Sequence, residues 1–352
     1  MRDEIFEQPD IVARLAADLT PYREAVTRAR AADVRFALYA ARGTSDNAAV
    51  YGKYLSTIHA GLPAGLAIPS SATVYDTPVD LHQCLVIGIS QSGETPDVAE
   101  YVAHAAEAGA LTVAITNDDD SLLARTAHLV LTTRAGHEQA VAATKTYTSQ
   151  LAALALFWAT WRNDTRLLGA LAREVPEAMR AALALEAPVA EIAQWLRFSE
   201  RLLVTARGYN FATALETALK LKETSYIAAM PYSAADLMHG PVAVVEPGYP
   251  AVLFSLSGRA LPAMRQVERD LLARGAELVV VEDDPAAAGP ATSPTPPEAP
   301  RRRALRLTAR VPEALSPLVA IVPGQLLALH LAQARGFDPD KPRGLNKVTK
   351  TL

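Results

Sequence analysis

Residues 90–96 (SQSGETP) gather neutral hydrogen-bond donors directly after a predicted strand, Leu85–Ile89. The segment opens a helix, with Thr95 as the expected N-cap and Pro96 as the first helical residue. A helix N-terminus offers free backbone N–H groups and a positive dipole end, both of which favour an anion. The pattern predicts a binding site for a phosphate carried by a small molecule. The alternative is an ordinary polar turn before a capped helix. The side-chain donors are Ser90, Gln91, Ser92 and Thr95.

A second hydroxyl-rich turn, residues 43–47 (GTSDN), follows the predicted strand Arg35–Ala40 and opens a helix that reaches about His59. Taken alone, this turn fits simple helix capping. Neither turn matches G-x-x-x-x-G-K-[ST] or G-x-G-x-x-G, so the sequence does not indicate a nucleoside triphosphate or a dinucleotide. A sugar phosphate is the favoured anion.

Charged residues recur on the predicted helix Phe211–Ala228. Glu216, Lys220 and Glu223 are spaced 4 and 3 apart and share one face, whereas Lys222 points elsewhere. A solvated charge ladder is the simple interpretation. The flanking residues are unusually apolar, however, and a carboxylate that is partly desolvated there would have a raised pKa and would suit proton transfer.

His239 differs in context from the histidines at 59, 104 and 330, which fall within helix patterns and are expected to be structural or exposed. It lies in the segment 236–241 (DLMHGP), in a loop constrained by Gly240 and Pro241 before a predicted strand, Val242–Val245. No H-E-x-x-H or comparable ligand cluster occurs, so no catalytic metal is expected.

The elements that position these residues alternate between short apolar strands and longer amphipathic helices. Such alternation predicts an α/β fold with parallel sheets covered by helices on both faces. The turns Arg42-Gly43 and Arg207-Gly208 each end a strand and open a helix, which indicates two similar α/β domains. The other predicted strands are Leu111–Ile115, Leu129–Thr132, Arg201–Thr205, Ala251–Leu256, Glu277–Val281 and Arg303–Thr308. The other predicted helices are Pro96–Ala108, an apolar helix entered from Glu138, Ala260–Arg274 and Leu315–Gly336.

We expect an N-terminal helical segment (1–32), a first domain (33–162), a helical connector (163–197), a second domain (198–330) and a C-terminal tail (331–352). A Pro/Ala-rich stretch near 284–302 buries too little apolar surface to offset its ordering entropy, so we predict a mobile surface insertion without a function of its own.

Composition sets limits on the class of protein. The 352 residues are 50% hydrophobic and 20% charged, which excludes wholesale disorder. A net charge of −4 argues against partners such as nucleic acid or an anionic membrane. The apolar run 151–161 is shorter than the ~20 residues of a membrane span. A single cysteine, Cys84, forms neither an internal disulfide nor a cysteine-based zinc site, which favours a reducing, cytoplasmic location.

Taken in order, these segments resemble the sugar isomerase (SIS) domain family, in the tandem arrangement of the isomerase half of glucosamine-6-phosphate synthase. The resemblance runs from about Phe36 to the C-terminus. Its markers are 42–45 (RGTS), 90–95 (SQSGET), 115–117 (ITN), 143–145 (ATK), 214–216 (ALE), 220–223 (KLKE), 238–241 (MHGP) and 342–347 (PRGLNK).

The resemblance implies two tandem SIS domains and a substrate that is a hexose or hexosamine 6-phosphate, without metal or other cofactor. It implies that Glu223 moves a proton between C1 and C2 and that His239 assists ring opening from the neighbouring subunit of a homodimer. It further implies that Lys220 stabilises negative charge on the sugar oxygens and that Lys347 forms a Schiff base. The residues it places around the phosphate and sugar are Thr44, Ser45, Ser90, Gln91, Ser92, Thr95, Val141 and Ala143.

Departures from the synthase narrow the expected reaction. The synthase carries a glutaminase domain with a leading cysteine, whereas residue 2 here is Arg2, and its Ser-Thr-Lys triplet is replaced by residues 143–145 (ATK), as in stand-alone relatives. Asn346 before Lys347 also departs from the synthase tail. We therefore expect conversion of glucosamine 6-phosphate to fructose 6-phosphate and ammonia. The alternatives are a fructosamine-6-phosphate deglycase, a synthase-like enzyme without glutaminase, and a non-catalytic sugar-phosphate sensor. A sensor would normally carry a DNA-binding helix-turn-helix, for which the residues before Val34 are too few.

Overall fold

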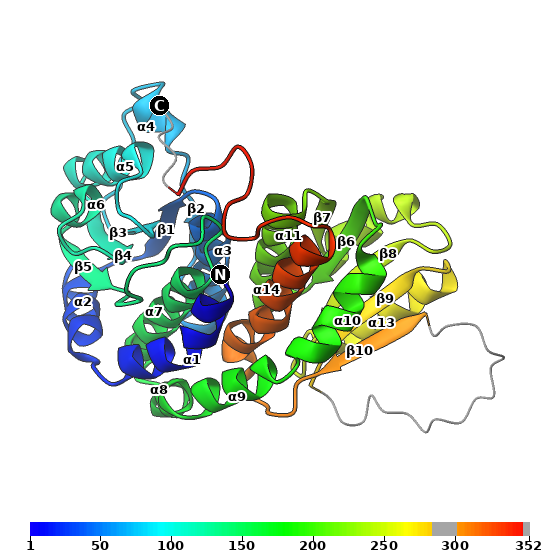
Figure 1. Cartoon of the computed structure of the whole chain (residues 1–352). Helices are drawn as coiled ribbons and strands as arrows, with labels where there is room; N and C mark the ends of the chain where they lie inside the picture. The colour runs from blue at the N-terminus through cyan, green and yellow to red at the C-terminus, as the bar shows by residue number, and fades with distance from the viewer. Residues whose placement is uncertain (284–300, 348–352) are drawn as a thin grey trace. The chain divides into compact units, whose positions relative to one another are not determined.

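The computed structural model describes residues 1–283 and 301–347, which form two compact units (Figure 1). The first unit combines Met1–Pro176 with the C-terminal segment that begins at Asp340, and the second comprises Glu177–Pro339. Each unit contains a five-stranded parallel sheet flanked by helices, which confirms the predicted α/β class. The Pro/Ala-rich insertion predicted near 284–302 lies outside the described residues except for its last two.

The first sheet has the strand order β2-β1-β3-β4-β5. Strand order reverses between β1 and β3, and in such open parallel sheets ligands bind beyond the carboxyl ends of the strands at the reversal. The central strand β3 is buried at every position, as expected for a strand covered on both faces. The strands are β1 (Phe36–Ala41), β2 (Ala64–Leu66), β3 (Cys84–Ser90), β4 (Leu111–Thr116) and β5 (Leu129–Thr132).

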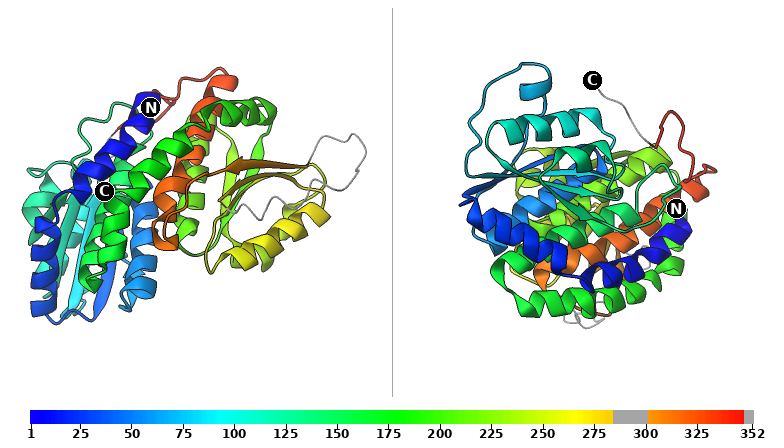
Figure 2. Two further views of the ribbon diagram at one scale, coloured as in Figure 1. Left: turned by 90° about the horizontal axis from the view of Figure 1, so that it is seen from below. Right: turned by 90° about the vertical axis from the view of Figure 1, so that its left-hand side faces the viewer.

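Helices cover both faces of the first sheet (Figure 2). Helices α5 and α6 pack on one face, where Gly88 of β3 lets them approach closely, because a Cβ there would lie 2.7 Å from a methyl carbon of Val102. Helices α2, α3 and α7 pack on the other face, and α1 packs on α7. The helices of this unit are α1 (Arg2–Ala16), α2 (Thr20–Ala31), α3 (Thr44–Tyr54, continued by the π-helical turn Leu55–His59), α4 (Ser70–Thr73), α5 (Pro96–Glu107), α6 (Leu122–Thr126), α7 (Lys145–Arg162) and α8 (Thr165–Ala172).

The second sheet repeats the order of the first. Read from β7, it runs β7-β6-β8-β9-β10, so that β6 and β8 occupy the places of β1 and β3. The turns that end β1 and β6 both contain a glycine with positive φ, Gly43 at +56° and Gly208 at +65°. The strands are β6 (Arg201–Ala206), β7 (Ala228–Ser233), β8 (Pro250–Ser255), β9 (Glu277–Glu282) and β10 (Arg302–Arg306).

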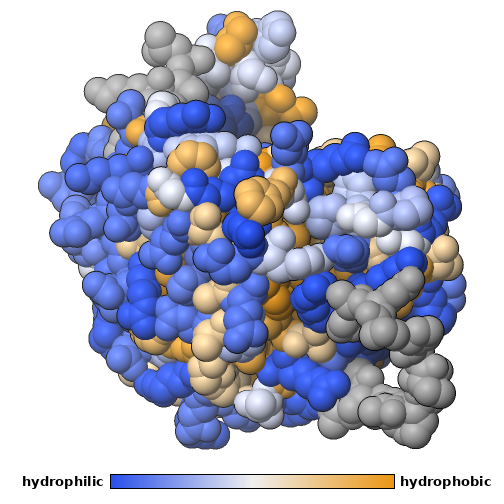
Figure 3. All heavy atoms as spheres, turned by 45° about the vertical axis from the view of Figure 1, so that its right-hand side comes forward, coloured by the Kyte–Doolittle hydropathy of each residue, from blue (hydrophilic) through white to orange (hydrophobic). Residues whose placement is uncertain are grey.

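Helices α11 and α14 pack together on one face of the second sheet, with α10 against α14, and α12 and α13 pack on the other face. Within the described part of the chain, the stretch Glu313–Ala334 alone is long and apolar enough to cross a membrane, but 94% of its most apolar window is buried in the fold. Hydrophilic residues cover most of the face shown in Figure 3. The helices are α9 (Glu174–Leu183, which begins in the first unit), α10 (Glu186–Leu196), α11 (Phe211–Ser225), α12 (Ala234–Met238), α13 (Leu261–Ala273) and α14 (Ser316–Ala334).

Two edge strands escape prediction from the sequence. Strand β2 has only three residues, and β7 contains Pro231, a residue that parallel sheets accept only at an edge. The predicted helix Phe211–Ala228 is therefore too long. It ends at Ser225 because Tyr226 adopts the left-handed conformation, with φ of +54°, without the glycine that usually marks such an end.

Two further predictions are wrong. The predicted strand Val242–Val245 is instead a 3-10 turn, Pro241–Val244. Its two buried valines are Val242 and Val245, which share one face at a spacing of three, as in a 3-10 helix, rather than alternating as in a strand. The apolar helix does not start near Glu138 but at Lys145, and residues 138–144 cross the carboxyl edge of the sheet as irregular chain.

Candidate functional site

The hydroxyl loop, residues 90–95, lies at the carboxyl end of β3, where the strand order reverses. Its own hydroxyl groups hold its shape. The Ser90 hydroxyl accepts a hydrogen bond from the Gly93 amide at 3.1 Å and lies 3.0 Å from the hydroxyl of Thr95. Ser92 accepts from the Glu94 amide at 3.2 Å. Ser90 is buried, whereas the side chains of Gln91, Ser92 and Thr95 are partly exposed and accessible to a ligand.

Thr95 is the N-cap of α5 and Pro96 its first residue, as predicted, but the Thr95 side chain makes no capping hydrogen bond. Its hydroxyl instead faces Ser90, so the N-terminus of α5 is not capped by its own N-cap side chain. Gly93 has φ of +68°, and a Cβ at this position would lie 2.0 Å from the Ser121 hydroxyl oxygen. Glycine is therefore required both for the turn and for its close packing.

The second turn lies beside the hydroxyl loop. Arg42 donates from Nε to Asp97 at 2.7 Å and forms an ion pair with the same carboxylate, so the end of β1 is tied to the first turn of α5. Ser45 is buried and accepts from the Gln150 amide of α7 at 2.9 Å. Thr44 is the first residue of α3 and is partly exposed. Thus β1, β3 and α7 all contribute to one edge. Sequence reasoning did not assign Asp97 or Gln150 to it.

Glu138 is the main residue that sequence reasoning missed. Its side chain is fully buried and accepts from the amides of Thr144 at 2.9 Å and Thr146 at 3.1 Å, and from the Thr146 hydroxyl at 2.7 Å. Lys347 of the tail donates to Glu138 and to the Ala140 carbonyl, at 2.6 Å each. Burial alone would raise the pKa of Glu138, but the Lys347 ammonium and the threonine donors together lower it below its usual value. One signal in the sequence could have indicated Glu138 as a site residue: it is a single acidic residue in the segment that follows the parallel strand β5.

Val141 and Ala143 lie in the same irregular segment and are partly exposed. The Val141 amide donates to the Asp340 carbonyl at 3.3 Å, which holds the tail along this edge of the sheet. The first unit therefore brings together the hydroxyl loop, Ser45, the 138–144 segment and Lys347 at the carboxyl edge of one sheet.

Helix α11 in the second unit carries the charged residues predicted for one face. Lys220 is 1% exposed and its ammonium lies 3.5 Å from Glu216, whose side chain is fully buried, and in direct contact with Glu223. The Glu223 side chain is 23% exposed. The sequence predicted partial desolvation of Glu223, but Glu216 and Lys220 are more completely buried than Glu223. Lys222, which was predicted to point away from this face, is exposed.

His239 follows α12 and precedes Gly240, whose φ is +131°. Its side chain is exposed, and its amide donates to the Asp236 carbonyl at 3.1 Å. Ser233 caps α12 by accepting from the Asp236 amide. The loop geometry therefore presents the imidazole at the surface of the second unit. Among the described residues, no group of three or more His, Cys, Asp or Glu side chains is placed to hold a metal ion.

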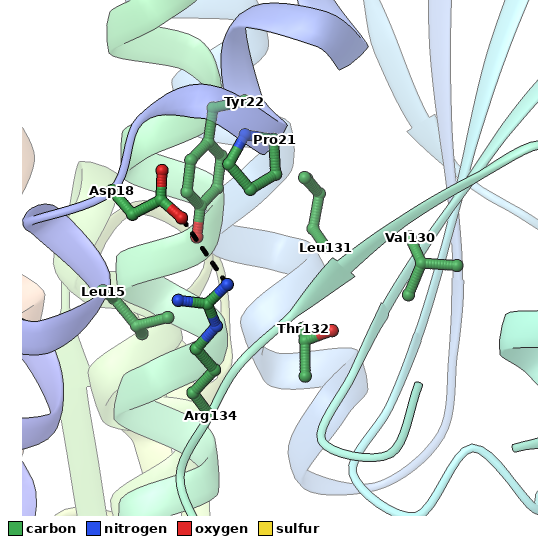
Figure 4. A pocket seen from close by; sticks show the side chains of 8 residues that line it. All are labelled: Leu15, Asp18, Pro21, Tyr22, Val130, Leu131, Thr132 and Arg134. Carbon is green, nitrogen blue, oxygen red and sulfur yellow. Dashed lines mark ion pairs between the residues drawn. The ribbon is translucent and has the colours of Figure 1, made fainter. Parts of the chain in front are cut away.

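A pocket of about 170 Å³ lies elsewhere in the first unit, between the α1–α2 turn and β5 (Figure 4). Its charged residues, Arg134 and Asp18, form an ion pair with each other at 3.5 Å. None of the predicted site residues lines it, and we assign it no role.

Comparison with known proteins identifies the family. The model of the SIS domain matches residues 32–159 and 196–332. Glutamine–fructose-6-phosphate aminotransferase (isomerizing) of Methanothermobacter thermautotrophicus is 37% identical over 351 residues, covering 99% of this chain and 56% of that enzyme. The chain thus spans little more than half the length of this relative.

Two solved structures extend the comparison. One from Silicibacter pomeroyi DSS-3, provisionally named a phosphosugar isomerase, is 33% identical with a TM-score of 0.85, covering 97% of this chain and 99% of that one. Glucosamine-6-phosphate deaminase of Thermotoga maritima is 21% identical with a TM-score of 0.71, covering 98% and 100%, and at this identity shows a shared fold alone. The chain belongs to the SIS domain family and carries two tandem SIS domains.

Proposed function

We propose that this chain is an isomerase-type enzyme that converts glucosamine 6-phosphate to fructose 6-phosphate and ammonia. The observation that carries the proposal is the carboxylate of Glu223 held against the buried ammonium of Lys220 on α11. A carboxylate in this position can act as the base of a proton transfer, and the adjacent ammonium can stabilise negative charge that develops on the sugar. The name of the relative from Methanothermobacter thermautotrophicus, an isomerizing aminotransferase of fructose 6-phosphate, supports a hexose phosphate and amine chemistry at the sugar.

The hydroxyl loop would hold the phosphate. Ser92, Thr95 and Gln91 provide partly exposed neutral donors, and the N-terminus of α5 adds its positive dipole end. Thr44 and Ser45 lie at the adjacent turn, and Val141 and Ala143 on the segment beyond β5. Fixing the phosphate at C6 positions the reacting carbons, which is a large part of what an enzyme contributes to such a reaction.

The chemistry is a proton transfer followed by hydrolysis. After ring opening, Glu223 removes the proton from C2 of the open-chain aldose, a double bond forms between C1 and C2, and O1 takes a proton from solvent to give the enolamine. The same carboxyl group returns its proton to C1, and the amine nitrogen releases a proton to solvent, which leaves an imine at C2. Water adds to this carbon and ammonia leaves, giving the ketose. Lys220 stabilises negative charge that develops on the sugar oxygens during transfer.

His239 would assist ring opening by proton transfer at the ring oxygen, and its exposure fits a role completed by a second copy of the chain. Lys347 is held by Glu138 and Ala140 in this state, where it orders the tail. A Schiff base with an open-chain ketose would require its amine to leave Glu138.

The test is an assay of the purified chain with glucosamine 6-phosphate, measuring ammonia and fructose 6-phosphate together. Glu223→Gln should abolish both products, whereas Lys222→Gln, a change of the exposed neighbour, should leave turnover unchanged. Binding without product formation would refute the proposal in favour of a sensor. Product from fructosamine 6-phosphate alone would identify a deglycase. Product only from fructose 6-phosphate supplied with ammonia or glutamine would identify a synthase-like reaction.

A mixing experiment tests the homodimer. Glu223→Gln and His239→Asn chains are each expected to be inactive. If His239 acts across subunits, a mixed dimer contains one intact pair, and an equal mixture should regain about a quarter of wild-type activity. No recovery in a mixture shown by mass to contain mixed dimers would place His239 in the same chain as the Glu223 it assists.

A further inference from the structure

The second SIS domain contains a loop that corresponds to the hydroxyl loop. In the shared strand order, β8 stands where β3 stands, and residues 255–260 (SLSGRA) therefore correspond to residues 90–95 (SQSGET). Each loop has a glycine with positive φ, Gly93 at +68° and Gly258 at +148°. Each also opens a long helix, α5 or α13, with a proline in the first turn. The second domain thus has a glycine-containing loop at the same position before a long helix, where backbone N–H groups can face an anion.

In the second domain this loop is occupied by the protein itself. The carboxylate of Glu313 accepts from the Arg259 amide at 2.9 Å with one oxygen and from the Ala260 amide at 3.2 Å with the other. Asp283 accepts from the Ser257 amide at 2.6 Å. Three backbone donors of the loop therefore point at two carboxylates, that of Asp283 directly after β9 and that of Glu313 in the 3-10 turn before α14. In the first domain, by contrast, the amides of Gly93 and Glu94 are held by hydroxyls within the loop.

The fit of Glu313 is close. A Cβ at Gly258 would lie 2.1 Å from the Glu313 carboxyl carbon, so the side chain occupies the space directly over the glycine. A cavity of only about 10 Å³ remains among Arg207, Tyr209 and Glu313, which is at the lower limit for a single water molecule. Ser255, which corresponds to Ser90, is fully buried, and its hydroxyl has no hydrogen-bond partner among the described residues.

We infer that Glu313 is a built-in occupant of the anion loop of the second SIS domain, and that it restricts the chain to one phosphate by filling the position that an oxyanion would take. Its two oxygens satisfy two consecutive backbone N–H groups, as two oxygens of a phosphate monoester would. The remaining cavity is too small for a second anion, and the negative charge of the Glu313 carboxylate would repel one. The inference concerns the second domain and does not depend on which sugar phosphate the first domain binds.

The competing explanation is that Glu313 only stabilises α13. The N-cap residue Ala260 makes no side-chain capping hydrogen bond, so Glu313 does act as a long-range cap. Both explanations predict that Glu313→Ala lowers stability. They differ in whether the loop binds phosphate once the Glu313 side chain has been removed, and that difference can be measured.

The experiment uses the full chain labelled with ¹⁵N-glycine and titrated with inorganic phosphate. Gly93 and Gly258 each report on one loop. In the wild-type protein, phosphate should shift the Gly93 amide and leave Gly258 unchanged. In Glu313→Ala both should shift at millimolar phosphate, and adding Asp283→Asn should lower the concentration that Gly258 needs. Glu246→Ala, which removes an exposed glutamate of the same unit, should behave like wild type.

Two results would overturn the inference. One is a saturable Gly258 shift in the wild-type protein, which would mean that Glu313 does not close the loop. The other is a Glu313→Ala protein with otherwise unchanged spectra whose Gly258 amide ignores phosphate, which would make Glu313 a cap alone. A missing Gly93 response would count against the proposed function only. Thermal unfolding provides a second readout, since phosphate should raise the Tm of Glu313→Ala more than that of wild type at equal ionic strength.

Discussion

Replacing Glu138 with glutamine tests whether one buried carboxylate organises the carboxyl edge of the first unit. The side chain is fully buried and accepts hydrogen bonds from Thr144, from Thr146 and from Lys347 of the tail. Glutamine keeps the shape but presents an NH₂ group where one oxygen stood. At the Oε2 position that group would face the Lys347 ammonium, which cannot accept a hydrogen bond, and the Thr146 hydroxyl, which would have to rotate in order to accept one. At the Oε1 position it would face the Thr144 and Thr146 amides, which cannot accept.

The expected cost follows from this count of donors. Hydrogen bonds to a buried charged group are worth about 1.5–3 kcal/mol each, and the remaining amide oxygen recovers part of them, so Glu138→Gln should cost about 3 kcal/mol. Lys347→Met should cost about 1–2 kcal/mol, because the carboxylate keeps its threonine donors and the lysine is 25% exposed. Glu7→Gln is the matched control. Glu7 pairs with Lys145 but is 51% exposed, so its loss should cost at most about 1 kcal/mol.

The direction of the pKa shift of Glu138 determines how its contribution to stability changes with pH. Because the folded state lowers the pKa of Glu138 below its reference value of 4.5, this group stabilises the fold above about pH 4.5. Its contribution is lost as the pH falls through the folded-state pKa, where the protonated wild type comes to resemble the glutamine variant. The difference in unfolding free energy between the two proteins should therefore be largest near pH 7 and should shrink towards pH 3.5.

Urea unfolding at pH 7 and pH 3.5 measures these differences, and limited trypsin digestion reports on the tail, which offers the Arg343–Gly344 bond as a cleavage site. Glu138→Gln should be cleaved in the tail faster than wild type, and Glu7→Gln should not. A cost below about 1 kcal/mol at pH 7, or a cost that is the same at both pH values, would refute the reasoning.

Three further outcomes are expected. Lys220→Met should abolish turnover and cost about 3–5 kcal/mol in urea unfolding, and adding Glu216→Gln should restore part of that stability, whereas purely additive losses would argue against coupling of the buried pair. Gly93→Ala should cost about 3 kcal/mol or more and eliminate substrate binding by calorimetry, because its φ is +68° and the new methyl would meet Ser121. Burial raises the pKa of Cys84 to about 11, so a thiol reagent at pH 8 should label the native protein about 100-fold more slowly than the urea-unfolded chain, and equal rates would contradict its burial.

Much of the fold is predictable because its central elements carry strong local signals. The apolar run of β3 and the Thr95-Pro96 start of α5 place both elements to within a residue. The edge strands fail for the opposite reason. Short length in β2 and Pro231 in β7 remove the local preference, and only pairing with β1 and β6 makes these residues strands.

The candidate site is predictable only where its residues are close in the sequence. The spacing of residues 216, 220 and 223 fixes their common face once the helix is given. The pair Glu138–Lys347 joins residues 209 apart, and Glu313 reaches Arg259 across 54 residues. No local pattern encodes such contacts, because they depend on which chain ends the sheet topology brings to the same edge.

The first unit is assembled from the beginning and the end of the chain, and this has a consequence for biosynthesis. All five strands of its sheet are complete by Thr132, but Glu138 receives its cation only when Lys347 has been made. At roughly 5–20 residues per second, the ribosome needs roughly 10–30 s to pass from the end of the first segment to that lysine, and it produces the entire second unit in between. During this interval the carboxyl edge of the first unit would stay open, and residues translated after the whole second unit would close it.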